Sequence, residues 1–280
     1  MVFRQFNFIW PLLLTASGFA LSATVETNSG TLVVFGFSKN KIVVAADSRG
    51  KKDAGDYADD KCKIIALTNK FVFAANGMTG LWSEVAVPYR PIEMDANEEA
   101  RHAFNSVRPR SDHFLRNVAV LWGDNVTRIF KQALKVAGPT ALGDDPNLNG
   151  YFFGVAPDSG LVLYMENVYV RGKDVSFDSE PQAIVLTDMV QYALQGKTDL
   201  AKKETDRWKR QSAALPVNED LDVLKVILWV QLTLDAHPDS NEIGGPIDSL
   251  TVTASRGVIW HKRKQECAAQ DLRVQQLPAQ

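Results

Sequence analysis

The sequence has little of what metal sites and polyanion-binding surfaces need. Its 280 residues include two cysteines and four histidines, and the formal net charge is -2. Charges of both signs are intermixed, so no field recruits nucleic acid or an anionic membrane by charge alone. The histidines follow no metal-ligand spacing, and we therefore expect no metal ion and no nucleic-acid partner. These histidines are His102, His113, His237 and His261.

Two motifs of common enzyme classes are also missing. No Gly-x-Ser-x-Gly elbow is present, which argues against a serine nucleophile of that type. Gly196-Lys197-Thr198 is similar to the end of a phosphate-binding loop. However, Gln191 stands where the first glycine of that loop should be, and we expect no strand before it. The sequence therefore gives no support for a nucleotide cofactor.

The longest apolar run lies near the N-terminus. Arg4 precedes an apolar stretch over 8–20 that ends in small residues, which is typical of a secretory signal. We expect residues 1–23 to be a signal peptide, cleaved before or after Ala23, and the mature protein to be exported, either periplasmic or secreted. Pro11 interrupts the run, which is shorter than the roughly 20 residues of a bilayer span, so a membrane anchor ranks second and a plain propeptide third. Without a signal peptide the protein would be cytoplasmic.

The two cysteines predict little by themselves. Cys62 lies between two lysines in an alternating strand pattern, which points it to the face opposite Lys63. Cys267 belongs to a Gln- and Ala-rich tail over 266–280, which we expect to be flexible. We therefore expect two unpaired thiols, although an exported protein could pair them if the tail folds back.

The segment after the leader has a regular pattern of strands and helices. Two hairpins are expected first, and we place them in one antiparallel sheet. A helix follows over 113–136, then strands of a second sheet, then helices over 188–211 and 219–236, and a closing hairpin. The expected strands span 31–38 and 41–46, 61–67 and 71–75, 151–155, 161–170 and 175–177, and 249–254 and 258–261. This order predicts one α+β domain over 31–265, with two antiparallel sheets layered between helices.

Four residues in the first third of the chain carry the most specific signal. Thr31 follows Gly30, Asp47 lies in Ala45-Ala46-Asp47-Ser48-Arg49, Lys63 in Lys61-Cys62-Lys63-Ile64, and Gly77 in Asn76-Gly77, at intervals of 16, 16 and 14 residues. A threonine hydroxyl is a poor nucleophile at neutral pH, so it needs a base, a nearby cation and an oxyanion donor. These four positions could supply them.

This combination resembles active proteasome β subunits, of the N-terminal nucleophile (Ntn) hydrolase family, over residues 30 to 80. The resemblance implies a four-layer αββα sandwich and a threonine-type peptidase or amidohydrolase that needs no cofactor. Thr31 would be the nucleophile and its freed α-amine the base. Lys63, held charged by Asp47, would lower the pKa of the Thr31 amine and of the Thr31 hydroxyl, and the Gly77 N–H would bind the oxyanion.

The resemblance also implies supporting roles. Arg49 would order the Asp47 turn, Ala75 would leave a deep specificity pocket with Lys61 at its rim, and cleavage after Gly30 would remove a propeptide over 24–30. Two later elements depart from the family pattern. The turn expected near Val185-Leu186-Thr187-Asp188 offers only the Thr187 hydroxyl, and Ser240 to Gly245 keeps two glycines but lacks the expected acid and serine. A one-residue shift would put Asp239 in place of the acid.

Several alternatives stay open from the sequence. Thr31-Leu32 could align two residues later, which would make Ser29 the nucleophile. A non-catalytic scaffold on the same fold, as in proteasome α subunits, is the second hypothesis, and an exported binding module is the third. For the enzyme we expect a peptide or protein substrate and a homo-oligomer, because the amphipathic helices leave faces that usually find partners.

Overall fold

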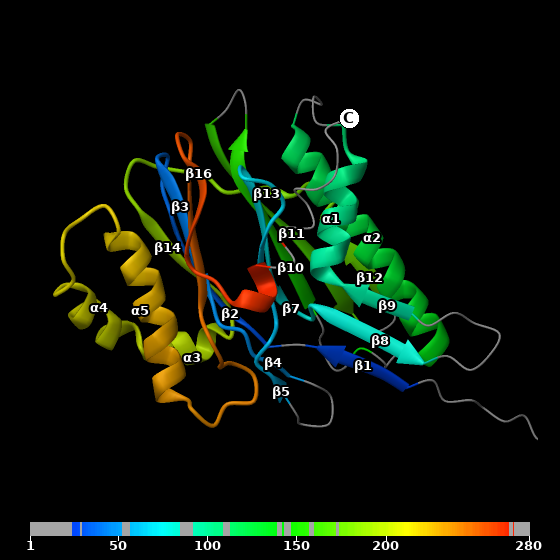
Figure 1. The fold of residues 1–280 in the computed structure, drawn as a ribbon. Coiled ribbons are helices and arrows are strands. Elements are labelled where there is room, and N and C mark those ends of the chain that lie inside the picture. Colours follow the sequence, from blue (N-terminus) through cyan, green and yellow to red (C-terminus); the bar gives the residue numbers. More distant parts are fainter. Residues whose placement is uncertain are drawn as a thin grey trace, which may run out of the picture.

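The computed structural model is an α+β protein built on two large antiparallel sheets (Figure 1). It describes residues 24–28, 30–51, 57–84, 92–108, 113–138, 142, 147–156, 160–171, 174–268 and 271. The expected signal peptide over 1–23 and the alternative nucleophile Ser29 lie outside these residues.

The first large sheet carries the segment that begins at Thr31. The strands lie in the order β14-β2-β3-β15-β16, and each pair is antiparallel. The strand bounds are β2 Leu32–Phe37, β3 Lys41–Ala46, β14 Gln191–Gly196, β15 Asp248–Thr253 and β16 Gly257–Lys262. The hairpins expected near 31–46 and 249–261 are thus confirmed, and Asp47 follows β3 at the end of the sheet where β2 begins.

The second large sheet carries the lysine and the glycine of the predicted site. Its order is β12-β11-β10-β7-β6, and β13 pairs with β11 beside this path. The bounds are β6 Ile64–Ala66, β7 Phe71–Gly77, β10 Asn147–Ala156, β11 Gly160–Arg171, β12 Asp174–Phe177 and β13 Gln182–Ala183. The prediction that both N-terminal hairpins share one sheet is therefore wrong. The β6–β7 hairpin pairs with β10, so Lys63 approaches Thr31 from the facing sheet.

Two short sheets complete the strands. β1 (Thr24–Asn28), β8 (Gly80–Glu84) and β9 (Ile92–Asp95) form the order β1-β8-β9, and β4 (Gly50–Lys51) pairs with β5 (Tyr57–Ala58). The segment expected to be a propeptide therefore contributes a strand, with Asn28 opposite Gly80.

The helices lie on the two outer sides of the pair of sheets (Figure 1). The bounds are α1 Ala96–Ser106, α2 Phe114–Ala137, α3 Thr198–Lys203, α4 Thr205–Ser212 and α5 Leu221–Ala236. The helices expected over 113–136 and 219–236 are confirmed, whereas the one expected over 188–211 is wrong, because β14 occupies its first part. None of the helices among the described residues has the length and apolar character that crossing a membrane requires.

Three apolar clusters hold these elements together. One lies between the sheets and includes Phe35, Val44 and Phe153. A second joins α1 and α2 to the outer face of the β6–β12 sheet through residues such as Trp122 and Phe152. A third packs α3 to α5 on the other sheet. Burying each large side chain contributes roughly 1.5–3 kcal/mol, so the facing sheets are fixed relative to each other and the residues between their ends are held in place.

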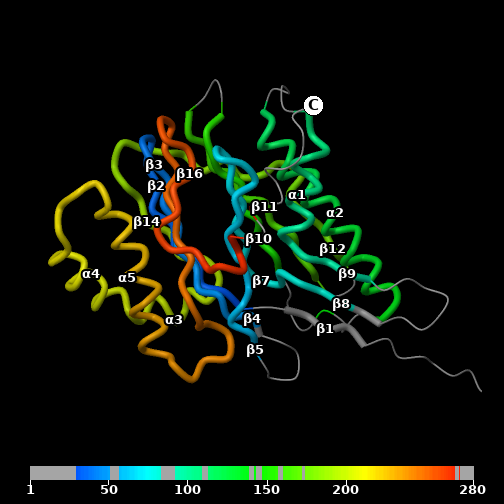
Figure 2. The backbone as a smooth tube through the Cα atoms, in the orientation of Figure 1, coloured from blue at the N-terminus to red at the C-terminus, as the bar shows by residue number. Residues whose placement is uncertain are grey.

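A disulfide joins Cys62 to Cys267, across 205 residues. The prediction of two unpaired thiols is therefore wrong, because the C-terminal segment folds back onto the segment that carries Lys63 and β6. Figure 2 shows the red end of the tube beside β7. Arg263 donates to the Ile64 carbonyl and to Asp271, and the Asp271 carboxylate accepts from the Ala66 N–H. Residues 263–268 and 271 thus lie against β6, although they fall largely in the expected flexible tail.

Candidate functional site

Thr31 lies at the entrance to β2, with almost no exposed surface. Gly30 before it has φ +91°, a left-handed conformation that favours glycine. This turn places the Thr31 hydroxyl against the preceding peptide group, where Oγ1 donates a hydrogen bond to the Gly30 carbonyl oxygen. A Cβ at position 30 would lie 2.6 Å from the Glu242 carbonyl oxygen, so the backbone packs tightly here.

Lys63 reaches the same carbonyl from the facing sheet. Its Nζ donates to the Gly30 carbonyl oxygen at 3.1 Å, to Asp47 Oδ1 at 2.9 Å and to the Arg49 carbonyl oxygen. These three acceptors match the three N–H donors of an ammonium group. Lys63 and Asp47 are both buried, so their charges interact with little screening by solvent.

Burial lowers the pKa of the Lys63 ammonium, and the Asp47 carboxylate opposes this effect. The two causes act in opposite directions because desolvation disfavours the charged amine whereas the nearby anion favours it. The result is a buried cation whose proton is held less tightly than that of a surface lysine. Such a group can stabilise negative charge and exchange a proton within one site.

Asp47 fixes this arrangement through its backbone contacts. Oδ1 accepts from the Leu32 N–H at 2.8 Å, and Oδ2 accepts from the Gly244 N–H at 2.9 Å and from the Arg49 N–H at 3.2 Å. The carboxylate thus ties the start of β2 to the Ser240–Gly245 loop. Ser240 to Gly245 is the element in which the sequence lacked the expected acid and serine, but its glycine backbone lies at the site.

Arg49, which we expected to order the Asp47 turn, joins this turn to Asp59 and Ser240. Its guanidinium makes a two-point ion pair with Asp59, at 2.7 and 2.9 Å, and donates to the Ser240 carbonyl oxygen at 2.6 Å. The Tyr57 ring stacks on the guanidinium at 3.8 Å. The Asp59 hydrogen bond raises the pKa of Arg49 and lowers that of Asp59. A Cβ at position 244 would lie 2.4 Å from the guanidinium carbon of Arg49, so the loop can approach Arg49 this closely only because residue 244 is glycine.

Gly196 lies between Thr31 and the end of β7. A Cβ on Gly196 would lie 2.0 Å from the Thr31 carbonyl oxygen and 3.5 Å from Asn76 Cβ, and Asn76 is the residue before Gly77. Gly77 itself has φ +93° and could not carry a Cβ, which would lie 2.1 Å from the Asn147 carbonyl oxygen. Asn76 is buried, and its Nδ2 donates to Tyr151 Oη at 3.0 Å.

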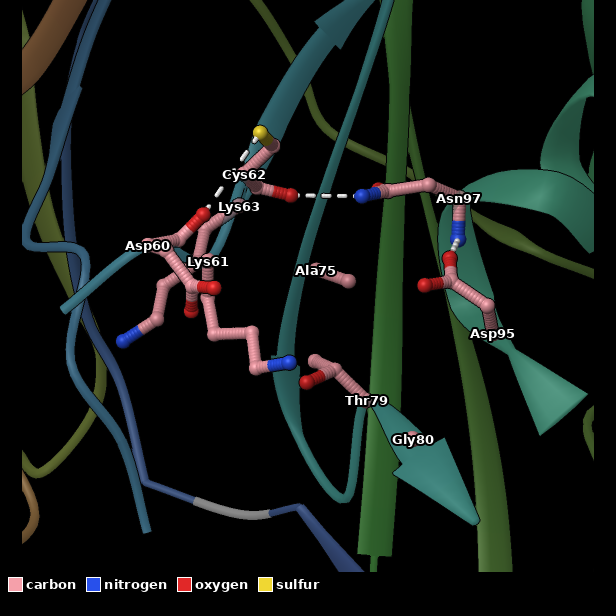
Figure 3. Close-up of a pocket in the computed structure, with 9 residues that line it drawn as sticks. All are labelled: Asp60, Lys61, Cys62, Lys63, Ala75, Thr79, Gly80, Asp95 and Asn97. Carbon is pink, nitrogen blue, oxygen red and sulfur yellow. Dashed lines mark hydrogen bonds between the residues drawn. The ribbon is translucent and has the colours of Figure 1, made fainter. Parts of the chain in front are cut away.

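A pocket of about 160 Å³ opens beside Lys63 (Figure 3). Figure 3 shows Ala75 between the segment of Asp60 to Lys63 and the residues Asp95 and Asn97. Ala75 and Lys61 therefore line one pocket, as expected. The carboxylates of Asp60 and Asp95 also line it, which the sequence did not predict. Asp95 Oδ1 accepts from the Asn97 and Glu98 N–H groups and caps α1.

Two of the expected supporting residues lie elsewhere. Thr187 lies beyond the far end of β2, where its carbonyl oxygen accepts from the Lys39 N–H and its hydroxyl donates to the Met189 carbonyl. Asp239 is exposed and directly precedes the Ser240–Gly245 loop, which contacts Asp47 through Gly244. Neither side chain is brought to Thr31, because β14 enters the site with its C-terminal end at Gly196 and not with the segment before it.

Two residues at the site were not predicted from the sequence. The Lys197 N–H donates to the Thr31 carbonyl oxygen at 2.8 Å, and Lys197 Nζ lies 2.8 Å from Glu242 Oε1. The available signal was the apolar segment Tyr192-Ala193-Leu194 before Gly196, which is too short to separate a strand from a helix.

Among the residues that the structure describes, no group of three or more histidine, cysteine or acidic side chains could hold a metal ion. The arrangement offers a hydroxyl, a buried lysine–aspartate pair and a strained glycine turn around one peptide bond. Comparison of the chain with protein-family models and with curated proteins found no match.

Proposed function

We propose that this protein is a threonine-type peptidase or amidohydrolase of the Ntn hydrolase family, and that its fold is the four-layer αββα sandwich of that family. The apolar clusters between the sheets and under the outer helices support the layering. The resemblance over residues 30 to 80 and the meeting of Thr31, Asp47 and Lys63 support the activity.

The observation that carries the proposal is the environment of the Gly30 carbonyl oxygen. It accepts from Thr31 Oγ1 and from Lys63 Nζ, so a nucleophile and a cation converge on one peptide group. Thr31 Oγ1 attacks the Gly30 carbonyl carbon, and the Lys63 ammonium stabilises the charge that develops on the oxygen. The hydroxyl proton passes to the Thr31 nitrogen as its bond to the Gly30 carbonyl carbon breaks, which leaves an ester on Oγ1 and a free amine. Water hydrolyses the ester, and the chain begins at Thr31.

The mature site then acts on other chains. The Thr31 hydroxyl attacks a substrate carbonyl while the free α-amine accepts its proton, directly or through water. The Gly77 N–H meets the oxyanion, an interaction worth roughly 3 kcal/mol in comparable sites. Release of the amine product leaves an acyl ester on Thr31, which water hydrolyses. No cofactor takes part in this sequence.

The leader strand supports a peptide or protein substrate. β1 pairs with β8, and Gly80 at the start of β8 also lines the pocket beside Lys63. Before cleavage the leader occupies this strand edge and keeps Thr31 buried. After cleavage the edge is open to an extended segment of another chain, which main-chain hydrogen bonds would hold.

The disulfide supports export as the localisation. Structural disulfides persist in oxidising compartments and are rare in the cytosol of most organisms. The pairing of Cys62 with Cys267 therefore agrees with a signal peptide over 1–23, with cleavage at Gly30 as a second and separate processing step.

A homo-oligomer is part of the proposal. Val185 and Met189 are large apolar side chains with more than three-quarters of their surface exposed, on the segment before β14. Contact between copies of the chain would cover them. Light scattering of the purified protein checks this, and a monomer of about 30 kDa at micromolar concentration would contradict it.

The second candidate is a non-catalytic scaffold. Thr187, the one hydroxyl that the sequence offered for the family's serine turn, lies beyond the far end of β2, and this departure favours the scaffold. A fluorogenic peptide library separates the two candidates. The enzyme should hydrolyse members of the library, and Thr31→Ala should abolish this whereas Ser29→Ala should not. No hydrolysis by a correctly processed wild type would favour the scaffold.

A further inference from the structure

Two residues of one ion pair, Lys197 and Glu242, approach Gly30 and Thr31 through their backbones and have no part in the chemistry above. On one side, the Lys197 N–H donates to the Thr31 carbonyl oxygen at 2.8 Å. On the other, the Glu242 backbone lies against Gly30, whose Cβ would be 2.6 Å from the Glu242 carbonyl oxygen. Lys197 Nζ and Glu242 Oε1 are 2.8 Å apart, and about a third of each side chain is exposed.

The loop that carries Glu242 is held firmly. Ser240 Oγ accepts from the Glu242 and Ile243 N–H groups at 3.2 and 3.3 Å, and Ile243 is fully buried. The next residue, Gly244, donates to Asp47. Glu242 is therefore fixed to the same carboxylate that holds Lys63, and its position relative to Thr31 does not depend on Lys197 alone.

Cleavage creates a new charge at Thr31, next to the backbones of these two residues. The Thr31 nitrogen changes from an amide to an α-amine, whose ordinary pKa is about 7.7–8.0. It must be neutral to accept a proton from the Thr31 hydroxyl. A nearby cation lowers the pKa of an amine, and a nearby anion raises it. The charged residues that contact residues 30–32 are Lys63 before β6, Asp47 after β3, Lys197 and Glu242, and Arg49 joins the Asp47 turn to Asp59.

We propose that Lys197 and Glu242 are positioning residues that hold the Thr31 amine and set its charge after the leader is removed. Once Gly30 has left, the Glu242 carbonyl and carboxylate oxygens accept hydrogen bonds from the Thr31 amine. The Lys197 ammonium offsets the negative charge of Glu242 and so limits how far Glu242 raises the pKa of this amine. This inference rests on the proposed function, because it needs an amine at Thr31.

The test measures the amine directly, without a substrate. The full-length gene is expressed, the processed protein is labelled with trace acetic anhydride between pH 6 and 9, and labelling of the N-terminal peptide is quantified by mass spectrometry. Lys197→Met removes the cation and should raise the apparent amine pKa by about half a unit to one unit, which is about a 3- to 10-fold slower labelling at pH 7. Glu242→Gln leaves Lys197 unpaired and should lower the apparent pKa of the Thr31 amine.

Lys39→Met is the matched control, because Lys39 also pairs with an acid, Asp188, but lies at the other end of β2. It should leave the amine pKa unchanged. Opposite shifts in the two site variants cannot come from a general loss of stability, which would move both in the same direction. Unchanged or parallel shifts in a processed protein would overturn this inference alone. A wild type with no Thr31 terminus would overturn the proposed function and this inference with it.

Discussion

Lys63 Nζ lies 3.1 Å from the carbonyl oxygen of Gly30, a residue 33 positions earlier in the chain. The two residues come from facing sheets, so the contact exists only when the sheets are packed together. It places a buried cation on the carbonyl of the peptide bond that the proposed function requires to break. Processing should therefore depend on the folded state and on this contact.

The turn at Gly30 gives the first prediction. Gly30→Ala should slow processing by more than 10-fold, because its Cβ would meet the Glu242 carbonyl oxygen and push the Gly30 carbonyl away from Lys63. Gly138→Ala is the control, since Gly138 also has φ +91° but has open space around its Cβ position. Both changes should cost about 1–2 kcal/mol for the left-handed backbone. Intact mass over time measures processing, and equal rates for both variants would contradict the prediction.

The disulfide gives the second prediction. Cys267→Ser should lower the free energy of unfolding by about 2–5 kcal/mol, because the bridge closes a long loop in the unfolded chain. Thermal unfolding should show a Tm lower by roughly 5–15 °C. Cys62→Ser and the double variant should behave like Cys267→Ser, since all three lack the same bond. A wild-type Tm that stays the same after reduction would argue against the bridge.

Glu166 on β11 gives a prediction for pH. It is fully buried against α2, neither of its carboxylate oxygens has a hydrogen-bond partner among the described residues, and burial, with the Asp178 charge, raises its pKa to about 8. The folded protein holds this proton between about pH 4.5 and 8 whereas the unfolded chain releases it, so this contribution to stability is lost as pH rises through about 8.

Glu166→Gln removes this titration. Its Tm relative to wild type should rise from pH 5 to pH 8 and then level off. Glu180→Gln, at an exposed acid, should show a pH-independent difference. A Glu166→Gln difference that stays constant between pH 5 and pH 8 would show that the carboxyl is ionised in the folded protein.

The pocket beside Lys63 gives a prediction for specificity. Ala75 leaves space in it, so large P1 residues should be preferred over glycine or alanine. Ala75→Leu should fill the pocket and reduce cleavage after large residues by about 10-fold or more, with a smaller effect on small ones. Lys61 at the rim should add little affinity for acidic residues, because exposed ion pairs contribute little and two carboxylates line the same pocket. Peptide-library profiling of both proteins measures the change.

The sequence predicted the elements with strong local patterns. β2 and β3 are buried along almost their whole length and appear in the sequence as short apolar runs rich in β-branched residues, whereas the apolar stripe of α2 recurs at three and four residues. β14 was missed because its six residues are half-buried at a sheet edge and are followed by charged helices. In so short a segment the periods of a strand and a helix cannot be separated.

The candidate site was predicted as far as its residues are close in sequence. Thr31 precedes β2, Asp47 follows β3 and Lys63 precedes β6, and their spacing carried the signal. Lys197 and Glu242 reach Thr31 from about 170 and 210 residues away, and only the pairing of β14 with β2 and the contact of Gly244 with Asp47 bring them there. The Cys62–Cys267 pair was missed for the same reason, because local composition says nothing about where the C-terminal segment returns.

The N-terminus of the purified protein tests the central claim most directly. The full-length gene should yield a chain whose intact mass begins at Thr31. Thr31→Ala and Lys63→Met should keep residues 24–30, since one lacks the nucleophile and the other lacks the cation on the Gly30 carbonyl, a group typically worth roughly 100- to 10,000-fold. Lys39→Met should process normally. A wild type that begins at Ala23 or Thr24, with no trace of a Thr31 terminus, would show that Thr31 is not the nucleophile.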